Sequence, residues 1–141
     1  MRFLILSLLI ALFVAMASGH TVTCFDKSKA ADSDGVIRGI EFMRHVEGLA
    51  LHGPGGTLPS AAGLDAHSCE FIYCHHKTSI RWCNDNDRYR MMEIEHIREG
   101  TEVLFRDCRK KASHRHTVAG GVIDHPDKWK VILEGDDRCN P

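Results

Sequence analysis

The chain has 141 residues, of which 43% are hydrophobic and 26% charged, and its formal net charge is −1 with histidine neutral. This length suits one domain with a modest core. The near-neutral balance gives no electrostatic reason to expect a nucleic acid or an anionic membrane as a partner.

The N-terminus has the three parts of a secretory signal. Arg2 supplies a positive charge, residues 3–14 form a short apolar stretch, and small residues follow. A transmembrane helix needs about 20 apolar residues, so this stretch is too short for a membrane anchor. We therefore predict a signal peptide over residues 1–19, cleaved after Ala17 or after Gly19, and a secreted, extracellular protein. Loss of Arg2 leaves a net charge of −2.

The mature chain, residues 20–141, is predicted to form a single domain. Its first half begins with a short alternating strand over residues 21–25. Apolar residues at helical spacing predict a helix over 36–51, with Asp32, Ser33 and Asp34 as candidates for its N-cap. A glycine-rich loop is expected over 53–66, which is longer than most connections in compact domains.

The second half begins with two strands, 68–75 and 79–84, joined by a tight turn at residues 77–78. A long helix is expected over 89–111. The last elements are strands 117–123 and 129–133, joined by a turn at 124–127. Gly120 and Gly121 indicate a bulge or a close helix-to-sheet contact. The inner stripe of the long helix is predicted to consist of Met91, Ile94, Ile97, Thr101, Leu104, Phe105 and Cys108.

The order strand, helix, hairpin, helix, hairpin predicts an α+β fold. An antiparallel sheet with both helices on one face would bury the inner stripe of each helix. We therefore expect a two-layer sandwich of the split βαβ type.

Six cysteines lie in the mature chain, and an even number in a small exported protein indicates three disulfides. Fifteen pairings are possible, and the sequence does not choose among them. Cys74 and Cys83 would face each other across the expected hairpin, which makes them one candidate pair. The six residues are Cys24, Cys69, Cys74, Cys83, Cys108 and Cys139.

This pattern of cysteines and strands resembles a known group. The segments that carry the resemblance are residues 22–24, 69–74, 80–86, 118–121 and 129–132, with Cys108 at the end of a helix. They are similar to the small secreted effectors of plant-associated fungi, particularly those with the α/β sandwich of smut-fungus viral killer toxins. The resemblance implies secretion and fold. Those toxins act on membranes or ion channels, but no residue of that activity carries over to this chain.

Ten histidines are many for a chain of this length. His114 and His116 are two residues apart beside a predicted strand and would project to one side, as a pair of metal ligands does. Cleavage after Gly19 would give His20 a free amine, which with its ring could chelate copper together with one more histidine. His75 and His76 would point to opposite faces of a strand, and His125 is expected at the tip of a turn. Surface histidines, and histidines that sense pH, are the alternatives to a metal site.

The sequence also leaves open that the protein is an enzyme. A secreted ribonuclease needs a base, an acid and a cation for the phosphate, and Glu70, His75, Arg81 and His125 supply those residue types. The second long helix does not suit the fold of fungal ribonuclease-like proteins, which has one helix. We therefore assign no catalytic residue and no cofactor. The sequence favours a non-enzymatic, monomeric effector or toxin-like protein that binds a host or competitor protein or a cell-surface component.

Overall fold

The computed structural model describes residues 19–48, 51–53, 56–58 and 61–140. Residues 1–18 lie outside the described residues, so the signal peptide stays a prediction, as does its cleavage after Ala17 or after Gly19. Within the described ranges, no helix is long and apolar enough to cross a membrane.

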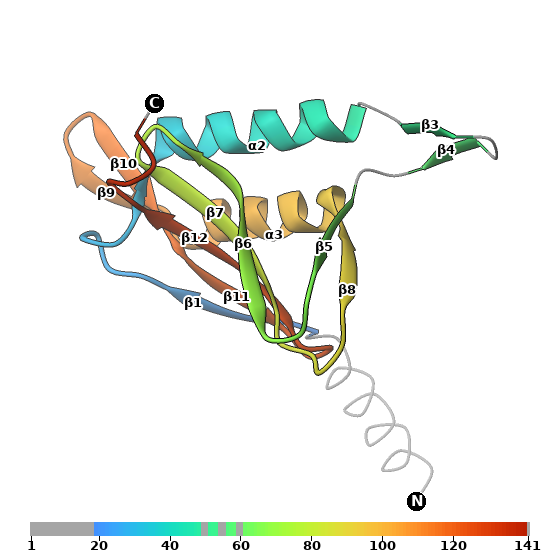
Figure 1. Cartoon of the computed structure of the whole chain (residues 1–141). Helices are drawn as coiled ribbons and strands as arrows, with labels where there is room; N and C mark the ends of the chain where they lie inside the picture. The colour runs from blue at the N-terminus through green and yellow to red at the C-terminus, as the bar shows by residue number, and fades with distance from the viewer. Residues whose placement is uncertain (1–18, 49–50, 54–55, 59–60, 141) are drawn as a thin grey trace, which may run out of the picture.

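The described residues form an α+β fold with antiparallel sheets, two helices and three disulfides (Figure 1). The helices are α2 (Ser33–Gly48) and α3 (Ile94–Asp107). The strands of the main sheet are β1 (Thr21–Cys24), β6 (Ser68–His75), β7 (Thr78–Asn84), β11 (Gly121–His125) and β12 (Trp129–Gly135). The shorter strands are β2 (Ala31–Asp32), β3 (Leu51–Gly53), β4 (Gly56–Leu58), β5 (Ala61–Leu64), β8 (Arg90–Glu93), β9 (Lys110–Ser113) and β10 (His116–Ala119).

The main sheet has the strand order β1-β11-β12-β7-β6, and all of its neighbours are antiparallel. Three smaller sheets accompany it, with the orders β2-β10-β9, β3-β4 and β5-β8. We expected a single sheet. The short strands therefore add pairings that the alternation of apolar residues did not predict.

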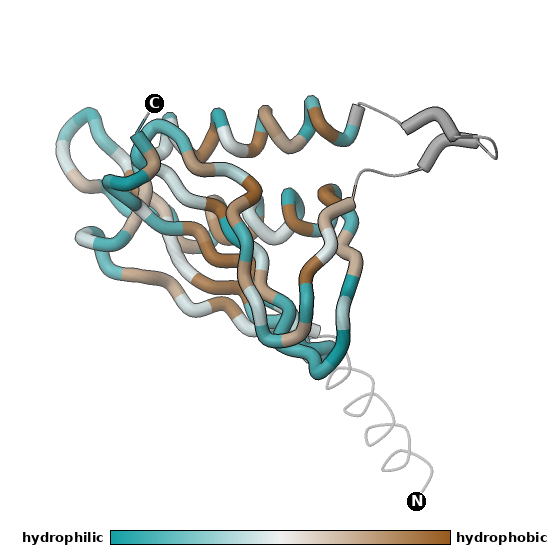
Figure 2. The backbone as a smooth tube through the Cα atoms, in the orientation of Figure 1, coloured by the Kyte–Doolittle hydropathy of each residue, from teal (hydrophilic) through white to brown (hydrophobic). Residues whose placement is uncertain are grey.

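Two glycines bring the helices close to the main sheet. A Cβ on Gly39 of α2 would lie 2.5 Å from Cδ1 of Ile80, and one on Gly100 of α3 would lie 3.1 Å from Cγ2 of Val131. Ile80 and Val131 belong to one face of the sheet, because Val131 pairs with Trp82 and alternate residues of a strand share a face. Both helices therefore contact this face, where Trp82, Ile80 and Val131 are fully buried. Figure 2 shows hydrophobic residues along these helices and strands and hydrophilic ones at the turns.

The N-terminus of α2 has one of the predicted caps. Oδ1 of Asp32 accepts a hydrogen bond from the backbone N–H of Asp34 at 2.8 Å, as an N-cap carboxylate does. The helix ends at Gly48, before the predicted end at residue 51, because residues 51–53 pair with residues 56–58 as β3 and β4. Described parts of the predicted loop 53–66 thus form strands, including β5.

The predicted helix 89–111 is wrong at both ends. Arg90–Glu93 is strand β8, which pairs with β5, and Lys110–Ser113 is strand β9. The residues of β8 alternate across the strand, so Met92 is buried and Met91, which we placed in the helix stripe, is 55% exposed. The apolar residues at the helix start thus follow the period of a strand.

The predicted strand 117–123 is two strands in two different sheets. β10 ends at Ala119 and β11 begins at Gly121. Gly120 lies between them, where a Cβ would come within 2.9 Å of Cα of Ala30 and 3.0 Å of the carbonyl oxygen of Leu133. The close contact at Gly120 is therefore with Ala30, just before β2, and with strand β12, and not between a helix and the sheet as expected.

The candidate pair Cys74–Cys83 is wrong. The bridges are Cys24–Cys108, Cys69–Cys83 and Cys74–Cys139. The β6-β7 turn lies at residues 76–77, so Cys74 faces Ser79. A shift in register between Phe71 and Tyr73 then brings Cys69 opposite Cys83.

Candidate functional site

A pocket of about 200 Å³ lies where the end of the β11-β12 hairpin meets α3. Three histidines from three segments line it. His20 precedes β1, His125 ends β11, and His96 lies near the start of α3. The remaining lining residues are Glu99, Gly100, Val103, Ile123 and Trp129.

His125 is held by Trp129. The two residues are directly opposite each other in the β11-β12 pairing. Their rings stack with centroids 3.7 Å apart and planes 4° from parallel. His125 was expected at the tip of a turn. It lies instead in the strand, because the turn occupies residues 126–128 and Lys128 has a φ of 63°.

Charged groups surround this stack. The guanidinium of Arg90 lies over the Trp129 ring at 5.9 Å from its centroid. Arg90 also donates a hydrogen bond to Oδ2 of Asp127 at 2.6 Å, within the turn that joins the strands. This ion pair links β8 to the turn of the β11-β12 hairpin.

The His125 ring is partly desolvated. Burial lowers the pKa of His125 below its ordinary value of 6.5, and the charges of His20 and Arg90 lower it further while Asp127 and Asp124 oppose the shift. Nε2 of His125 is buried and has no hydrogen-bond partner within the part of the chain that the structure describes. The His20 ring lies 5.9 Å from the His125 ring, centroid to centroid. A neutral imidazole with a free nitrogen can bind a metal or a hydrogen-bonding ligand.

The helix side of the pocket supplies a half-exposed imidazole between two carboxylates. Nδ1 of His96 lies 3.6 Å from Oε2 of Glu99, and its Nε2 lies 3.8 Å from Oε2 of Glu93. Glu99 follows His96 by three residues in α3, which places the two side chains on one face of the helix, and Glu93 is the last residue of β8, just before the helix.

The histidines predicted to bind a metal do not come together. His20 lies at the pocket, His116 in β10, and His114 in the turn between β9 and β10. Nε2 of His116 lies 2.6 Å from Oδ2 of Asp32, so this ring already has a partner. As the side chains stand in the described ranges, no three His, Cys, Asp or Glu residues lie close enough to hold a metal ion.

The residues of the ribonuclease alternative are also separated. Glu70 pairs with Trp82 and Phe71 with Arg81, so Glu70 and Arg81 lie on opposite faces of the sheet. His75 pairs with Thr78 at one end of β7, whereas His125 lies at the other end, level with Asn84. Six strand steps separate these histidines by about 20 Å along the strand direction alone. The arrangement therefore gives this alternative no support.

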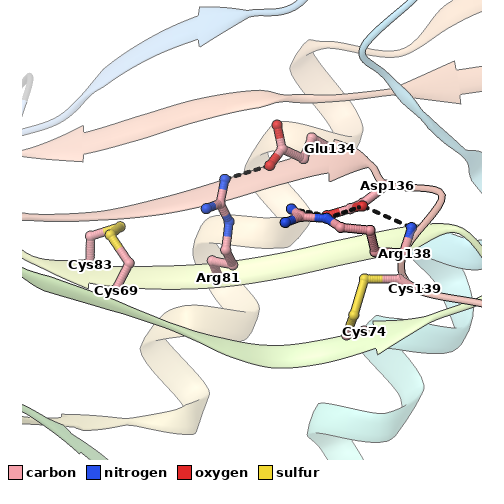
Figure 3. Close-up of polar contacts among 8 residues, drawn as sticks. All are labelled: Cys69, Cys74, Arg81, Cys83, Glu134, Asp136, Arg138 and Cys139. Carbon is pink, nitrogen blue, oxygen red and sulfur yellow. Dashed lines mark hydrogen bonds and ion pairs between the residues drawn. A yellow bond between two sulfur atoms is a disulfide. The ribbon is translucent and has the colours of Figure 1, made fainter.

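Arg81 forms an ion pair on the face of the sheet that is opposite the helices (Figure 3). It pairs with Glu134 of β12, next to the two disulfides of β6. Arg138 nearby donates to Asp136 at 2.7 Å and lowers the pKa of that carboxyl to about 2. On this face the Cys74–Cys139 bridge joins the C-terminal tail to the sheet.

The sequence reasoning missed His96, Glu99 and Trp129 as pocket residues. One available signal was the spacing of His96, Glu99 and Gly100, which places them on one side of a helix. The stacking of Trp129 on His125 depends on the hairpin register, which the position of the turn sets. No protein-family model, curated protein or solved structure matches the chain.

Proposed function

We propose that this chain is an exported, non-enzymatic effector or toxin-like protein that binds a host or competitor protein or a cell-surface component. The observation that carries the proposal is the disulfide framework, in which all six cysteines are paired. Such bridges persist in oxidising, extracellular surroundings. The predicted signal peptide supports the same location.

We also propose that the protein is a monomeric two-layer sandwich of the split βαβ type. Strand order supports this assignment. β7 and β11 both run antiparallel to β12, which lies between them, and the chain passes from β7 to β11 through α3. The contacts of Gly39 and Gly100 with the same face of the sheet support a separate helical layer.

The pocket of His20, His96 and His125 is the proposed contact site for the partner. Its side chains come from three segments, and Cys24–Cys108 links the first of these segments to the C-terminal end of α3. The bridge thus joins β1, which follows His20, to the helix that carries His96. The ring nitrogens and the Glu99 carboxylate can form hydrogen bonds with polar groups of a partner.

The test is a pull-down from host extracellular fluid with the oxidised mature protein, followed by mass spectrometry. We expect a specific partner whose recovery falls at least about tenfold with His96→Ala, since a few residues near the centre of an interface carry most of the affinity. The matched control is His114→Ala, an exposed histidine outside the pocket, which should leave recovery unchanged. Equal recovery with both variants would remove the pocket from the proposal. RNA cleavage by the same preparation, without any specific partner, would overturn the proposed function.

A further inference from the structure

We propose that His20, His96 and His125 form a binding site for a divalent transition metal of the zinc class. This inference goes beyond the proposed function and does not depend on it. The three imidazoles line one pocket, and imidazole nitrogen is a preferred ligand of Zn²⁺. His20 was also a candidate from the sequence, whereas His96 and His125 take the place of His114 and His116.

The rings of His20 and His125 already lie close to each other. Metal–nitrogen bonds of about 2.0–2.1 Å place two imidazoles on one ion with ring centroids roughly 4.5–6.5 Å apart. The centroids of His20 and His125 are 5.9 Å apart, with ring planes inclined by 50°. His125 is oriented by its stack on Trp129, so the exposed His20 is the ring that adjusts.

The buried nitrogen of His125 supports the assignment. Its Nε2 has no hydrogen-bond partner in the described ranges, although buried polar atoms in folded proteins are mostly paired. A metal ion would satisfy this atom.

His96 supplies the third ligand by rotating its side chain. It is half-exposed, and its contacts with Glu93 and Glu99 are long, at 3.8 and 3.6 Å. Little is therefore lost when the ring turns toward the pocket. A contact from Nδ1 to Glu99 would leave Nε2 for the ion, and carboxylates commonly orient metal-binding histidines in this way. Three histidines leave the fourth position of a tetrahedral zinc ion open to water or to a ligand.

The test is calorimetric titration of the purified mature chain with ZnCl₂, without any partner. The N-terminal amine is blocked by acetylation, so that it cannot supply a nitrogen. We expect one Zn²⁺ per chain, with affinity at least about 100-fold weaker in His125→Ala and His20→Ala. Loss of an outer-shell carboxylate typically costs 10–100-fold, so Glu99→Gln should weaken binding by about tenfold. His20 is exposed and precedes β1, so its variant tests the site without disturbing the fold.

The matched control is His114→Ala, which should bind Zn²⁺ as the wild type does. Co²⁺ provides a second readout, because tetrahedral coordination by histidines gives visible absorption bands that His20→Ala should lose. Absence of stoichiometric binding, or equal affinity in the wild type and His20→Ala, would overturn the site. Neither result would alter the pull-down, so failure of this inference is distinguishable from failure of the proposed function.

Discussion

The imidazole of His125 stacks on the indole of Trp129, with centroids 3.7 Å apart and planes 4° from parallel. The pair closes the β11-β12 hairpin at its turn. Trp129 is only 6% exposed, so the stack shields one side of the imidazole from water. The stability of the fold is therefore coupled to the protonation of a residue in the candidate site.

We predict that His125 makes the protein less stable in acid. In the unfolded chain its pKa is about 6.5, and burial lowers the pKa in the folded state. The unfolded state then binds more protons in this range. The contribution of the neutral ring is complete above about pH 6.5 and is lost as the pH falls through the folded-state pKa. Urea unfolding of the wild type at pH 7 and pH 5 measures this loss.

The comparison variant is His125→Phe, which keeps an aromatic ring on Trp129 and cannot titrate. Its free energy of unfolding should fall less between pH 7 and pH 5 than that of the wild type. The other histidines are common to both proteins and cancel in the comparison. An equal fall in both would show that His125 does not contribute to the acid sensitivity.

Asn84 provides the second prediction. It is fully buried, and its Nδ2 donates to the carbonyl oxygens of Leu64, Asp65 and Arg88 at 3.1, 3.2 and 2.7 Å. Asn84→Asp would replace these donors with a carboxylate that faces carbonyl oxygens. We expect the free energy of unfolding at pH 7 to fall by at least about 3 kcal/mol, since buried unpaired groups are costly.

Urea unfolding checks the effect of Asn84→Asp, with Asn140→Asp as the matched control. Asn140 is exposed near the C-terminus, so the same chemical change there should alter stability by less than about 0.5 kcal/mol. If Asn84→Asp were as mild as its control, the three hydrogen bonds would not hold the β6-β7 sheet edge to residues 64–65 and 88.

The sequence predicted the elements whose apolar period is unambiguous. The hairpins β6-β7 and β11-β12 and the central part of α3 are confirmed. The pairing of Cys69 with Cys83 could not be predicted from the sequence, because one irregular register step between Phe71 and Tyr73 determines it. Such a step leaves no clear mark in the apolar pattern.

The candidate site was harder to predict than the fold. Its histidines are 76 positions apart in one pair and 29 in another, and only the tertiary arrangement joins them. The sequence singled out His20 for its place beside the cleavage site, and the structure adds His125 as its neighbour. Charge and spacing could not supply that neighbour, because the position of the hairpin turn determines where His125 lies.

The third prediction concerns the unequal contributions of two disulfides to the free energy of unfolding. Cys24–Cys108 joins residues 84 positions apart, whereas Cys69–Cys83 joins residues 14 apart. In the chain-entropy model a longer closed loop restricts the unfolded state more. Replacing both cysteines of the longer bridge with serine should therefore reduce the free energy of unfolding by about 1.5 kcal/mol more than the same change in the shorter bridge.

Urea unfolding of the two double-serine variants measures this difference. Mass spectrometry of an unreduced digest serves as the control, because each variant must retain the other two bridges. If the Cys69/Cys83 variant proved the less stable, then local strain in β6 and β7, and not loop length, would govern the ranking.

The last prediction concerns Gly121, where β11 begins. A Cβ there would overlap the carbonyl oxygen of Thr23 and lie 3.1 Å from Cα of Cys24. Both atoms belong to the backbone of β1, so they cannot move aside as a flexible side chain would. Gly121→Ala should therefore push β1 away from β11 and reduce the free energy of unfolding by about 1–3 kcal/mol.

Hydrogen exchange localises the effect of Gly121→Ala. The amide of Phe25, which donates to the carbonyl oxygen of Gly120 at 2.9 Å, should exchange faster, whereas amides of the β7-β12 pairing should keep their relative protection. Ala112→Ser, at an exposed position in β9, is the control and should leave Phe25 protected. Unchanged exchange at Phe25 in the glycine variant would show that β1 does not depend on the missing side chain. Because β1 follows His20 directly, displacement of this strand should also move His20 away from His125 and weaken Zn²⁺ binding.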